Sequence, residues 1–289
     1  MRKILLTVFL LNLLVCVPSY SFELFNKTPK AQLKSTIRQY HKAIKNQDIE
    51  KIKTFYDEEY KSMDGFDLAQ SMEMLEKTYS VYKDIKYKTK INSINMDEQW
   101  ALVQMSDRSY AKIYPIEDKD LKKEKMGKLE GKSVYNVYLK KINNEWKIAS
   151  DDILMEETSL KYGIANKIDM NLITPYRVKA GQDYDLSLRI EKPKDVIALA
   201  SISREEIVYP PSDYKEKFRK IPEFGELERV VKANNKNLDE YAVASVGLTK
   251  ISMNEEQTKA RIEVLGLAYL MKRVNLDRTR TNGEILVGK

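Results

Sequence analysis

Cysteine and histidine are almost absent from this chain of 289 residues, which has one of each, Cys16 and His41. Cys16 lies in the leader segment described below, so the mature chain is expected to contain no cysteine. That absence excludes disulfides, thiolate nucleophiles and thiolate metal sites. A single histidine leaves no zinc site built from nitrogen and sulfur ligands, and we predict neither a metal nor a cofactor.

Glycine-rich loops are missing as well. The ten glycines are scattered, and no phosphate-binding loop or dinucleotide fingerprint can be read from them. Serine nucleophile motifs are also absent in a usable setting. Ser212 and Lys215 have a Ser-x-x-Lys spacing, but they follow Pro210 and Pro211, and we interpret the match as chance. No catalytic residue is assigned from the sequence, which favours a non-enzymatic role.

Long apolar runs are confined to the N-terminus. Arg2 and Lys3 precede the apolar stretch Ile4–Leu14, and small serines lie before a cut ahead of Phe22. This pattern is typical of a secretory signal, so residues 1–21 are predicted to be a signal peptide and the chain to be exported, periplasmic or extracellular. The run is shorter than the roughly 20 apolar residues of a membrane span, and no transmembrane helix is expected in the mature chain.

Cys16 leaves a second interpretation of this segment open. Leu13, three residues before it, resembles the start of a lipobox, whose cysteine becomes a lipid anchor. Val15 stands where such signals prefer glycine or alanine, which favours plain cleavage with Cys16 discarded.

Charge is mildly basic, at +7, because 50 Lys and Arg are interspersed with 43 Asp and Glu. A nucleic-acid-binding protein usually concentrates its basic residues in a stripe or tail. The densest basic stretch, Lys119–Lys132, also contains acids, and the segment Pro115–Lys132 is predicted to be a solvated loop. We therefore predict a small molecule or an envelope protein as partner, and no nucleic acid.

Three amphipathic helices are predicted near the N-terminus. Leu33, Ile37, Tyr40 and Ile44 are spaced four, three and four apart, which places them on one face of a helix. A second helix is predicted from Ile49 to Tyr60, with Asp48 as its N-cap. A third begins at Asp67, where Gln70 completes a capping box, and runs to about Lys83.

A period of two replaces the helical period from Tyr87 onward. Alternation in Trp100–Ser106 and Val134–Ile142 predicts strands, and Asn143–Asn144 predicts a hairpin turn into Trp146. Trp100 and Trp146 are expected to pack the sheet onto the helices. The order is three helices followed by a curved antiparallel sheet.

This order, with the motifs "AIKNQDIEKIKTFY" and "VYLKKINNEWKIASDD" and the helix beginning at Asp67, resembles the nuclear transport factor 2-like superfamily over about residues 31–155. The superfamily includes SnoaL-like and ketosteroid-isomerase-like proteins, and the resemblance implies a cone-shaped α+β domain enclosing a pocket. Because enzymes, binding modules and structural domains all use this fold, the resemblance predicts fold better than function.

The second half is predicted to be mainly β. We expect a domain at residues 22–155, a linker at 156–167 and a sandwich-like β domain at 168–289, because short alternating runs recur there. The stretch "VKAGQDYDLSLRIEKP" resembles bacterial immunoglobulin-like modules, a likeness drawn over about residues 168–275, without their cysteine pair. Ile221–Lys232 reads equally as a short helix or an edge strand.

The candidate pocket combines polar and aromatic residues of the first domain. His41 borders the apolar stripe of the first helix. It could act as a general base in a pocket, but a histidine that makes an ordinary hydrogen bond at the flank of a helix is the favoured interpretation. Asp64 precedes Gly65 in a common turn pair. Asp107 follows the second predicted strand; in ketosteroid-isomerase-like enzymes sheet acids and a tyrosine carry proton transfer, but no motif here assigns that role to a particular residue. The acids Asp151 and Asp152 are interpreted as solvated rather than as calcium ligands. The predicted pocket residues are Tyr40, His41, Tyr56, Tyr60, Asp64, Trp100 and Asp107.

The sequence thus favours an exported, non-enzymatic envelope protein whose cone-shaped domain holds a small ligand or a protein. The alternative is a cone-fold isomerase, dehydratase or hydrolase that uses Asp107 with Tyr56 or His41. A third hypothesis is a homodimer formed through the open face of the sheet.

Overall fold

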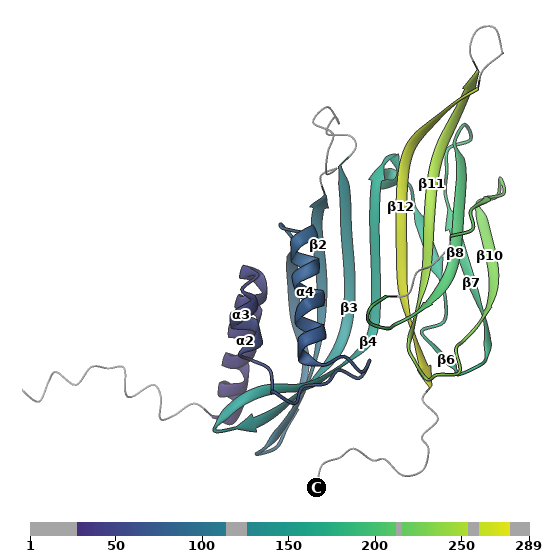
Figure 1. The fold of residues 1–289 in the computed structure, drawn as a ribbon. Coiled ribbons are helices and arrows are strands. Elements are labelled where there is room, and N and C mark those ends of the chain that lie inside the picture. The colour runs from purple at the N-terminus through teal and green to yellow at the C-terminus, as the bar shows by residue number, and fades with distance from the viewer. Residues whose placement is uncertain (1–27, 114–125, 212–215, 254–259, 278–289) are drawn as a thin grey trace, which may run out of the picture.

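The computed structural model describes residues 28–113, 126–211, 216–253 and 260–277. The predicted signal peptide with Cys16, the Ser212–Lys215 match and the C-terminal tail from residue 278 lie outside these ranges. No helix in the described ranges is long and apolar enough to cross a membrane. The fold is α+β, mostly antiparallel sheet with few helices (Figure 1).

The elements follow in chain order. The helices are α2 (Pro29–Asn46), α3 (Ile49–Lys53) and α4 (Leu68–Val81). The first strands are β1 (Lys86–Met96), β2 (Trp100–Ile113), β3 (Gly127–Ile142) and β4 (Glu145–Gly163), which a 3-10 turn, η2 (Ile164–Lys167), follows. The later strands are β5 (Met170–Ile173), β6 (Arg177–Lys179), β7 (Asp183–Ile190), β8 (Ile197–Glu206), β9 (Arg219–Lys220), β10 (Glu226–Lys232), β11 (Glu240–Met253) and β12 (Ala260–Asp277).

Local signals set the helix ends. Asp48 caps α3 by accepting from the amide of Lys51 at 3.0 Å, and Asp67 and Gln70 form the predicted capping box of α4. The prediction that the second helix reaches Tyr60 is wrong. It ends at Lys53, because the backbone around Phe55 bonds to β4 instead, with the Ile148 amide 2.8 Å from the Phe55 carbonyl.

One large sheet runs through both halves of the chain in the order β1-β2-β3-β4-β12-β11-β8-β9, and β6 pairs in parallel with β12. The junction is β4, a strand of 19 residues whose second half bonds to β12 between Glu157 and Gly163. The predicted linker at 156–167 is therefore strand and 3-10 turn. Residues 156–163 are all half-buried, as in a strand with neighbours on both edges and partial cover on its faces.

Two other predicted loops and turns need correction. Residues 127–132, predicted to be solvated loop, form the first part of β3 and pair with β2. The remainder of that loop, residues 114–125, lies outside the described ranges. The undecided segment Ile221–Lys232 resolves into strand β10, which pairs with β7 over Glu226–Lys232 in a separate sheet ordered β10-β7-β5.

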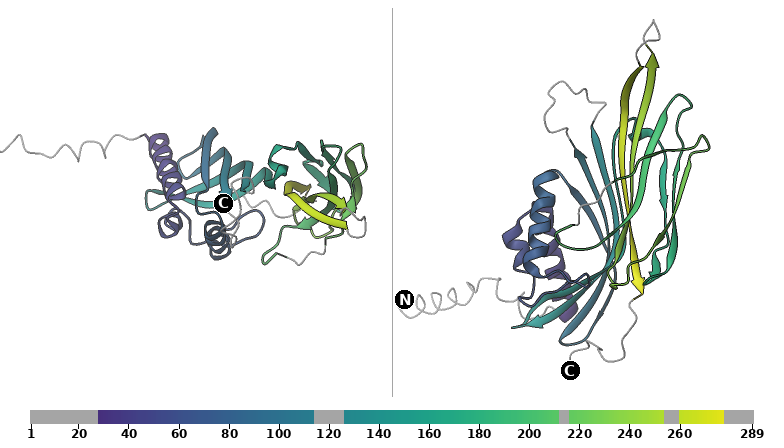
Figure 2. Two further views of the ribbon diagram at one scale, coloured as in Figure 1. Left: turned by 90° about the horizontal axis from the view of Figure 1, so that it is seen from above. Right: turned by 45° about the vertical axis from the view of Figure 1, so that its right-hand side comes forward.

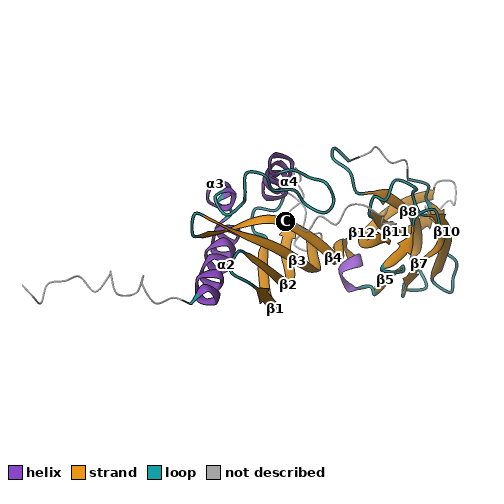
Figure 3. Cartoon of the chain, turned by 90° about the horizontal axis from the view of Figure 1, so that it is seen from below, coloured by secondary structure: helices purple, strands orange, loops and turns teal. Residues whose placement is uncertain are grey.

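Helices and the small sheet cover opposite faces of the large sheet (Figures 2 and 3). Leu33 of α2 and Met72 of α4 share a hydrophobic core with Val103 and Leu139 on the face of β1–β4 that the helices cover. Beyond the junction, Leu186 of β7 packs with small residues of β11 from the other side. Each half of the large sheet has one covered face, and the cover changes sides at β4 and β12.

Trp100 departs from its predicted role. Trp146 is 2% exposed and packs in the first core, whereas Trp100 is 43% exposed. Side chains alternate across a strand, and the buried positions of β2 begin at Ala101 and Val103. Trp100 therefore lies on the open face of the sheet and is not part of the pocket.

Candidate functional site

A pocket of about 360 Å³ lies on the helix-covered face of the large sheet, between α4 and the junction of β4 with β12. We call it the helix-side pocket. It takes side chains from both halves of the chain, because β12 lies next to β4 in the sheet. Its lining is Thr78, Tyr82, Ile85, Tyr87, Asp107, Ser109, Leu129, Gly131, Lys132, Ser133, Glu156, Thr158, Leu160, Tyr269 and Met271.

Asp107 is the predicted residue that lies in this pocket. The Tyr135 hydroxyl donates to its Oδ2 at 2.8 Å, and its Oδ1 is buried without a hydrogen-bond partner among the described residues. Burial, followed by the charge of Asp107, raises the pKa of Tyr135 far above its usual range, so the phenol stays a donor. Burial and Asp107 also raise the pKa of Tyr87 to about 12.

Glu156 gives the pocket a second carboxyl group. The Tyr241 hydroxyl donates to its Oε2 at 2.8 Å. Burial raises the pKa of Glu156, and the bond from Tyr241 opposes that rise only in part. The pocket therefore places two acidic groups, one from β2 and one from β4, among apolar and phenolic walls.

His41 lies near Asp107 without lining the pocket. Its Nε2 is buried and has no partner among the described residues. Burial lowers the pKa of His41, and the charge of Asp107 opposes that change. Its ring meets Tyr40 edge to face, with centroids 5.5 Å apart. The sequence placed His41 correctly at the border of the helix stripe.

The predicted tyrosines come together in a different place. Tyr40 and Tyr56 join their hydroxyls at 3.0 Å, and Tyr56 meets Tyr60 edge to face at 4.8 Å. The Tyr60 hydroxyl then donates to Asp151 at 2.9 Å. Tyr40 belongs to α2, and Tyr56 and Tyr60 follow α3; none of the three lines the helix-side pocket. They stabilise the interior of the first half. The predicted pocket residues therefore fall in more than one place, with Asp107 in the helix-side pocket and the three tyrosines outside it.

Asp151 differs from its interpretation as a solvated acid. Burial raises its pKa to about 6, although the hydrogen bond from Tyr60 opposes the shift. The alternation of β4 would give its inward position, but bulges beside Val134 and Tyr138 of β3 change the register. Propensity carries no signal for those bulges, so the burial of Asp151 could not be predicted from the sequence.

Asp64 does more than begin the predicted turn. Gly65 has the positive φ of 92° that such a turn requires. The Asp64 carboxylate also accepts from both terminal nitrogens of Arg273, with Nη1 to Oδ2 at 3.0 Å. Arg273 is 1% exposed and donates to Asp239 at 2.7 Å. This buried cluster ties the loop after α3 to β12.

Five residues of this polar interior were not found from the sequence: Tyr135, Asp151, Glu156, Tyr241 and Arg273. All five lie on strands, where alternation tells which residues share a face but not which face is covered. The described residues hold no group of three or more metal-ligating side chains that could bind an ion.

The sequence matches no family model and no curated protein. Solved structures that resemble it include Bd1075 from Bdellovibrio bacteriovorus, at 25% identity and a TM-score of 0.33, over 42% of this chain and 38% of that protein. The chain thus spans well under half the length of Bd1075.

The names of two further similar structures mention a family or an activity. A candidate dehydratase of the NTF2-like family from Streptomyces avermitilis is 12% identical, with a TM-score of 0.35, over 42% of this chain and 92% of its own. AclR from Streptomyces galilaeus, a candidate hydroxylase, is 13% identical, with a TM-score of 0.31, over 42% and 77%. The neighbours therefore include a member of the superfamily that residues 31–155 resemble.

Proposed function

We propose that this chain is a binding protein whose helix-side pocket holds a small amine with an apolar body. Asp107 carries the proposal: it lines the pocket, Tyr135 fixes one of its carboxylate oxygens, and the other, which is buried, has no hydrogen-bond partner among the described residues. A buried acceptor left unpaired is costly, so a donor on the ligand would be strongly favoured there. The Asp107 oxygen thus sets the position of the ligand's polar group.

The remaining lining specifies the rest of the ligand. Rings of Tyr82, Tyr87 and Tyr269 can lie against a cation, and Leu129 and Leu160 offer apolar contact. The volume of about 360 Å³ is at the lower end of the range for small-molecule sites. The carboxylate of Asp107 favours an ammonium group on the ligand over a neutral hydroxyl or an anion.

Calorimetric titration with hexylamine, hexanol and hexanoate tests this proposal. We expect hexylamine to bind best, and Asp107→Asn to weaken its binding about tenfold, because a charge-assisted contact is lost. Asp185→Asn is the matched control, since Asp185 is exposed on β7. Equal binding of hexanoate, no binding of any probe, or equal hexylamine affinity in the Asp107 variant would contradict the proposal.

Acid–base catalysis is the second function that a specific observation favours. Asp107 acts electrostatically on His41, and each has a buried atom without a partner among the described residues. A general base must reach the proton it removes. His41 does not line the pocket, and Asp151, with its pKa near 6, does not line it either. Ligand binding is therefore the better-supported function.

An isomerase-type activity has a direct test. Deuterium exchange at the carbons beside the carbonyl of cyclohexanone, followed by proton NMR, would be faster with the enzyme, and both Asp107→Asn and His41→Gln would abolish the acceleration. An exchange rate equal to that of buffer for the native chain rules out this second function.

The wider setting is also part of the proposal. We infer a cone-shaped first domain, an immunoglobulin-like second domain and export to the cell envelope. The supports are the leader pattern of residues 1–21, the helix-covered β1–β4 and the two facing sheets beyond them. Mass spectrometry of the mature chain checks export: a mass that begins at Phe22 supports plain cleavage, and an acylated Cys16 as first residue supports anchoring.

A homodimer through the open sheet face is proposed on two exposed aromatic residues. Trp100 and Tyr110 are 43% and 36% exposed on the face of β2 away from the helices. Sedimentation velocity should show a dimer that Trp100→Lys converts to a monomer. A monomeric native chain at every accessible concentration contradicts it.

A further inference from the structure

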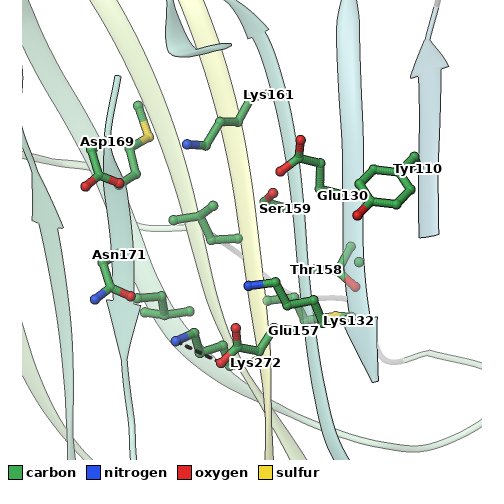
Figure 4. A pocket seen from close by; sticks show the side chains of 15 residues that line it. Tyr110, Glu130, Lys132, Glu157, Thr158, Ser159, Lys161, Asp169, Asn171 and Lys272 are labelled. Carbon is green, nitrogen blue, oxygen red and sulfur yellow. Dashed lines mark ion pairs between the residues drawn. The ribbon is translucent and has the colours of Figure 1, made fainter. Parts of the chain in front are cut away.

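A second cavity lies on the opposite face of the large sheet, between β3, β4, β12 and the small strand β5 (Figure 4). We call it the outer groove; its volume is about 330 Å³. Glu156 lines the helix-side pocket and Glu157 lines the groove, because successive side chains of a strand point to opposite faces. The two cavities lie on opposite faces of the sheet and share Gly131, Lys132, Thr158 and Met271 in their linings, and neither depends on the function proposed for the other.

One end of the outer groove carries a positive charge. Lys132, Glu157 and Lys272 lie side by side in one row across β3, β4 and β12. Glu157 pairs with Lys272 at 3.2 Å and accepts from the Tyr176 hydroxyl at 3.3 Å. Lys132 has no ion pair among the described residues, and its side chain extends into the groove in Figure 4. Two ammonium groups against one carboxylate leave this end at +1.

The other end carries a negative charge. Glu130 and Asp169 lie on either side of Lys161, as Figure 4 shows. The Lys161 ammonium donates to the Ile168 carbonyl at 3.0 Å, which holds it in place. Burial lowers the pKa of Lys161, and the charges of Asp169 and Glu130 oppose that effect. Among the side chains that line the groove, two carboxylates against one ammonium group leave this end at −1; Lys128, opposite Lys161 on β3, lies outside the lining.

The spacing of the two ends is set by the strand. Glu130 and Lys132 are two residues apart on β3, so their side chains leave the same face about 7 Å apart. Ser159 lies between the charged ends and offers a hydroxyl, and Asn171 on β5 offers an amide near the positive end. An extended peptide spans about 3.3–3.6 Å for each residue, so termini about 7 Å apart or slightly more belong to a chain of two or three residues.

We propose that the outer groove binds a short peptide with free ends. The terminal carboxylate pairs with Lys132, and the terminal ammonium pairs with Glu130 and Asp169. Ser159 and Asn171 bond to the peptide groups between the ends. The complementary charges set the direction of the peptide along the groove and exclude peptides whose termini are blocked.

Calorimetric titration with four forms of trialanine tests the assignment. The forms are the free peptide, the N-acetyl peptide, the C-terminal amide and the doubly blocked peptide. We expect the free peptide to bind best, and each block to weaken binding about tenfold, because each removes one charge-assisted contact.

Substitutions then assign each end. Lys132→Gln should weaken the free peptide about tenfold and leave the C-terminal amide unchanged, since that form lacks the carboxylate. Glu130→Gln should likewise weaken binding of the free peptide about tenfold. It should leave binding of the N-acetyl form unchanged, since that form lacks the terminal ammonium group. Lys128→Gln is the matched control, because Lys128 lies on the same face of β3 two rows from Lys132 and does not line the groove. All three positions are exposed, so the variants should fold.

Three results overturn the proposal. The first is that free trialanine does not bind. The second is that doubly blocked trialanine binds as tightly as the free form. The third is that Lys128→Gln weakens binding as much as Lys132→Gln, which would indicate attraction to general surface charge. None of these results bears on whether hexylamine binds in the helix-side pocket, so the two proposals can fail separately.

Discussion

At the scale of single residues, the buried charges of this protein are paired more fully than the sequence suggests. Arg273, which is 1% exposed to solvent, forms ion pairs with both Asp64 and Asp239. Removing one member of a buried ion pair leaves an uncompensated charge, which costs more than the pair contributes. Such residues are therefore sensitive to substitution whether or not they have a functional role.

Arg273→Met should lower the free energy of unfolding by about 3–5 kcal/mol, because two buried carboxylates lose their cation. Urea denaturation followed by circular dichroism measures it. Adding Asp64→Asn to that variant should recover part of the loss. The control is Arg177→Met: the Arg177 side chain is 65% exposed, and its pair with Asp277, at 3.6 Å, contributes at most about 1 kcal/mol. Equal losses in the two arginine variants would contradict the account.

Asp151 gives a pH dependence whose sign follows from its burial. Its pKa is about 6 in the folded chain against an ordinary 3.8, so the folded state binds the proton more tightly than the unfolded state. Its contribution to stability is therefore greatest below the ordinary pKa and falls as pH rises through the folded pKa.

Asp151→Asn removes that dependence and keeps an acceptor for Tyr60. The stability of the variant relative to the native chain should rise by about 1.4 kcal/mol for each pH unit between about 4 and 6, or about 3 kcal/mol in all. Chemical denaturation at a series of pH values measures the difference. A difference that is flat over this range, or that has the opposite slope, shows that the Asp151 carboxyl is not buried as described.

At the scale of elements, the end of β4 depends on one glycine. Gly163 has φ 59° and ψ −137°, a conformation that residues with a side chain rarely adopt. A Cβ there would lie 2.2 Å from the Leu265 carbonyl oxygen, because β12 passes directly beside it. The glycine lets the chain leave β4 into η2 while β4 and β12 stay paired.

Gly163→Ala should lower the free energy of unfolding by at least about 2 kcal/mol, from backbone strain and the clash with Leu265 together. Gly247→Ala is the matched control within the same sheet. A Cβ on Gly247 meets nothing within 4 Å, and the change should stay within about 0.5 kcal/mol. Thermal unfolding of both variants measures the contrast, and similar losses would argue against the close approach of β12.

At the scale of the whole molecule, the two halves share backbone hydrogen bonds. β4 bonds to β12 over seven residue pairs, Glu157↔Lys272 through Gly163↔Gly266, and Arg273 adds its ion pair to Asp64. Because opening this junction breaks strand pairing and exposes buried charges, neither half can unfold without disturbing the other.

We therefore expect one cooperative unfolding transition. Both tryptophans, Trp100 and Trp146, lie in the first half, so their fluorescence reports on that half, while far-ultraviolet circular dichroism reports on both. The two urea midpoints should coincide. Separate midpoints would mean that the halves unfold independently and that the shared sheet contributes little to their coupling.

Local patterns in the sequence determined the helices, their caps and most of the first strands. Asp48, Asp67 and Gln70 act on amides a few residues away, and helical or strand periodicity needs no distant partner. The hairpin turn at Asn143–Asn144 is local in the same way, and both residues have the positive φ of such a turn. These features depend on short-range chemistry, which a sequence displays directly.

Only the tertiary structure decided the ends of α3, the course of β4 and the contents of the helix-side pocket. Phe55 and Tyr56 leave their helix because β4 offers backbone partners, and residues 156–163 become strand because β12 lies beside them. Asp107 was predicted as a pocket residue, but its partner Tyr135 and the second acid Glu156 depend on which face of each strand is covered. That choice is made by α4 on one side and by β5 and β7 on the other, through contacts between residues far apart in the chain.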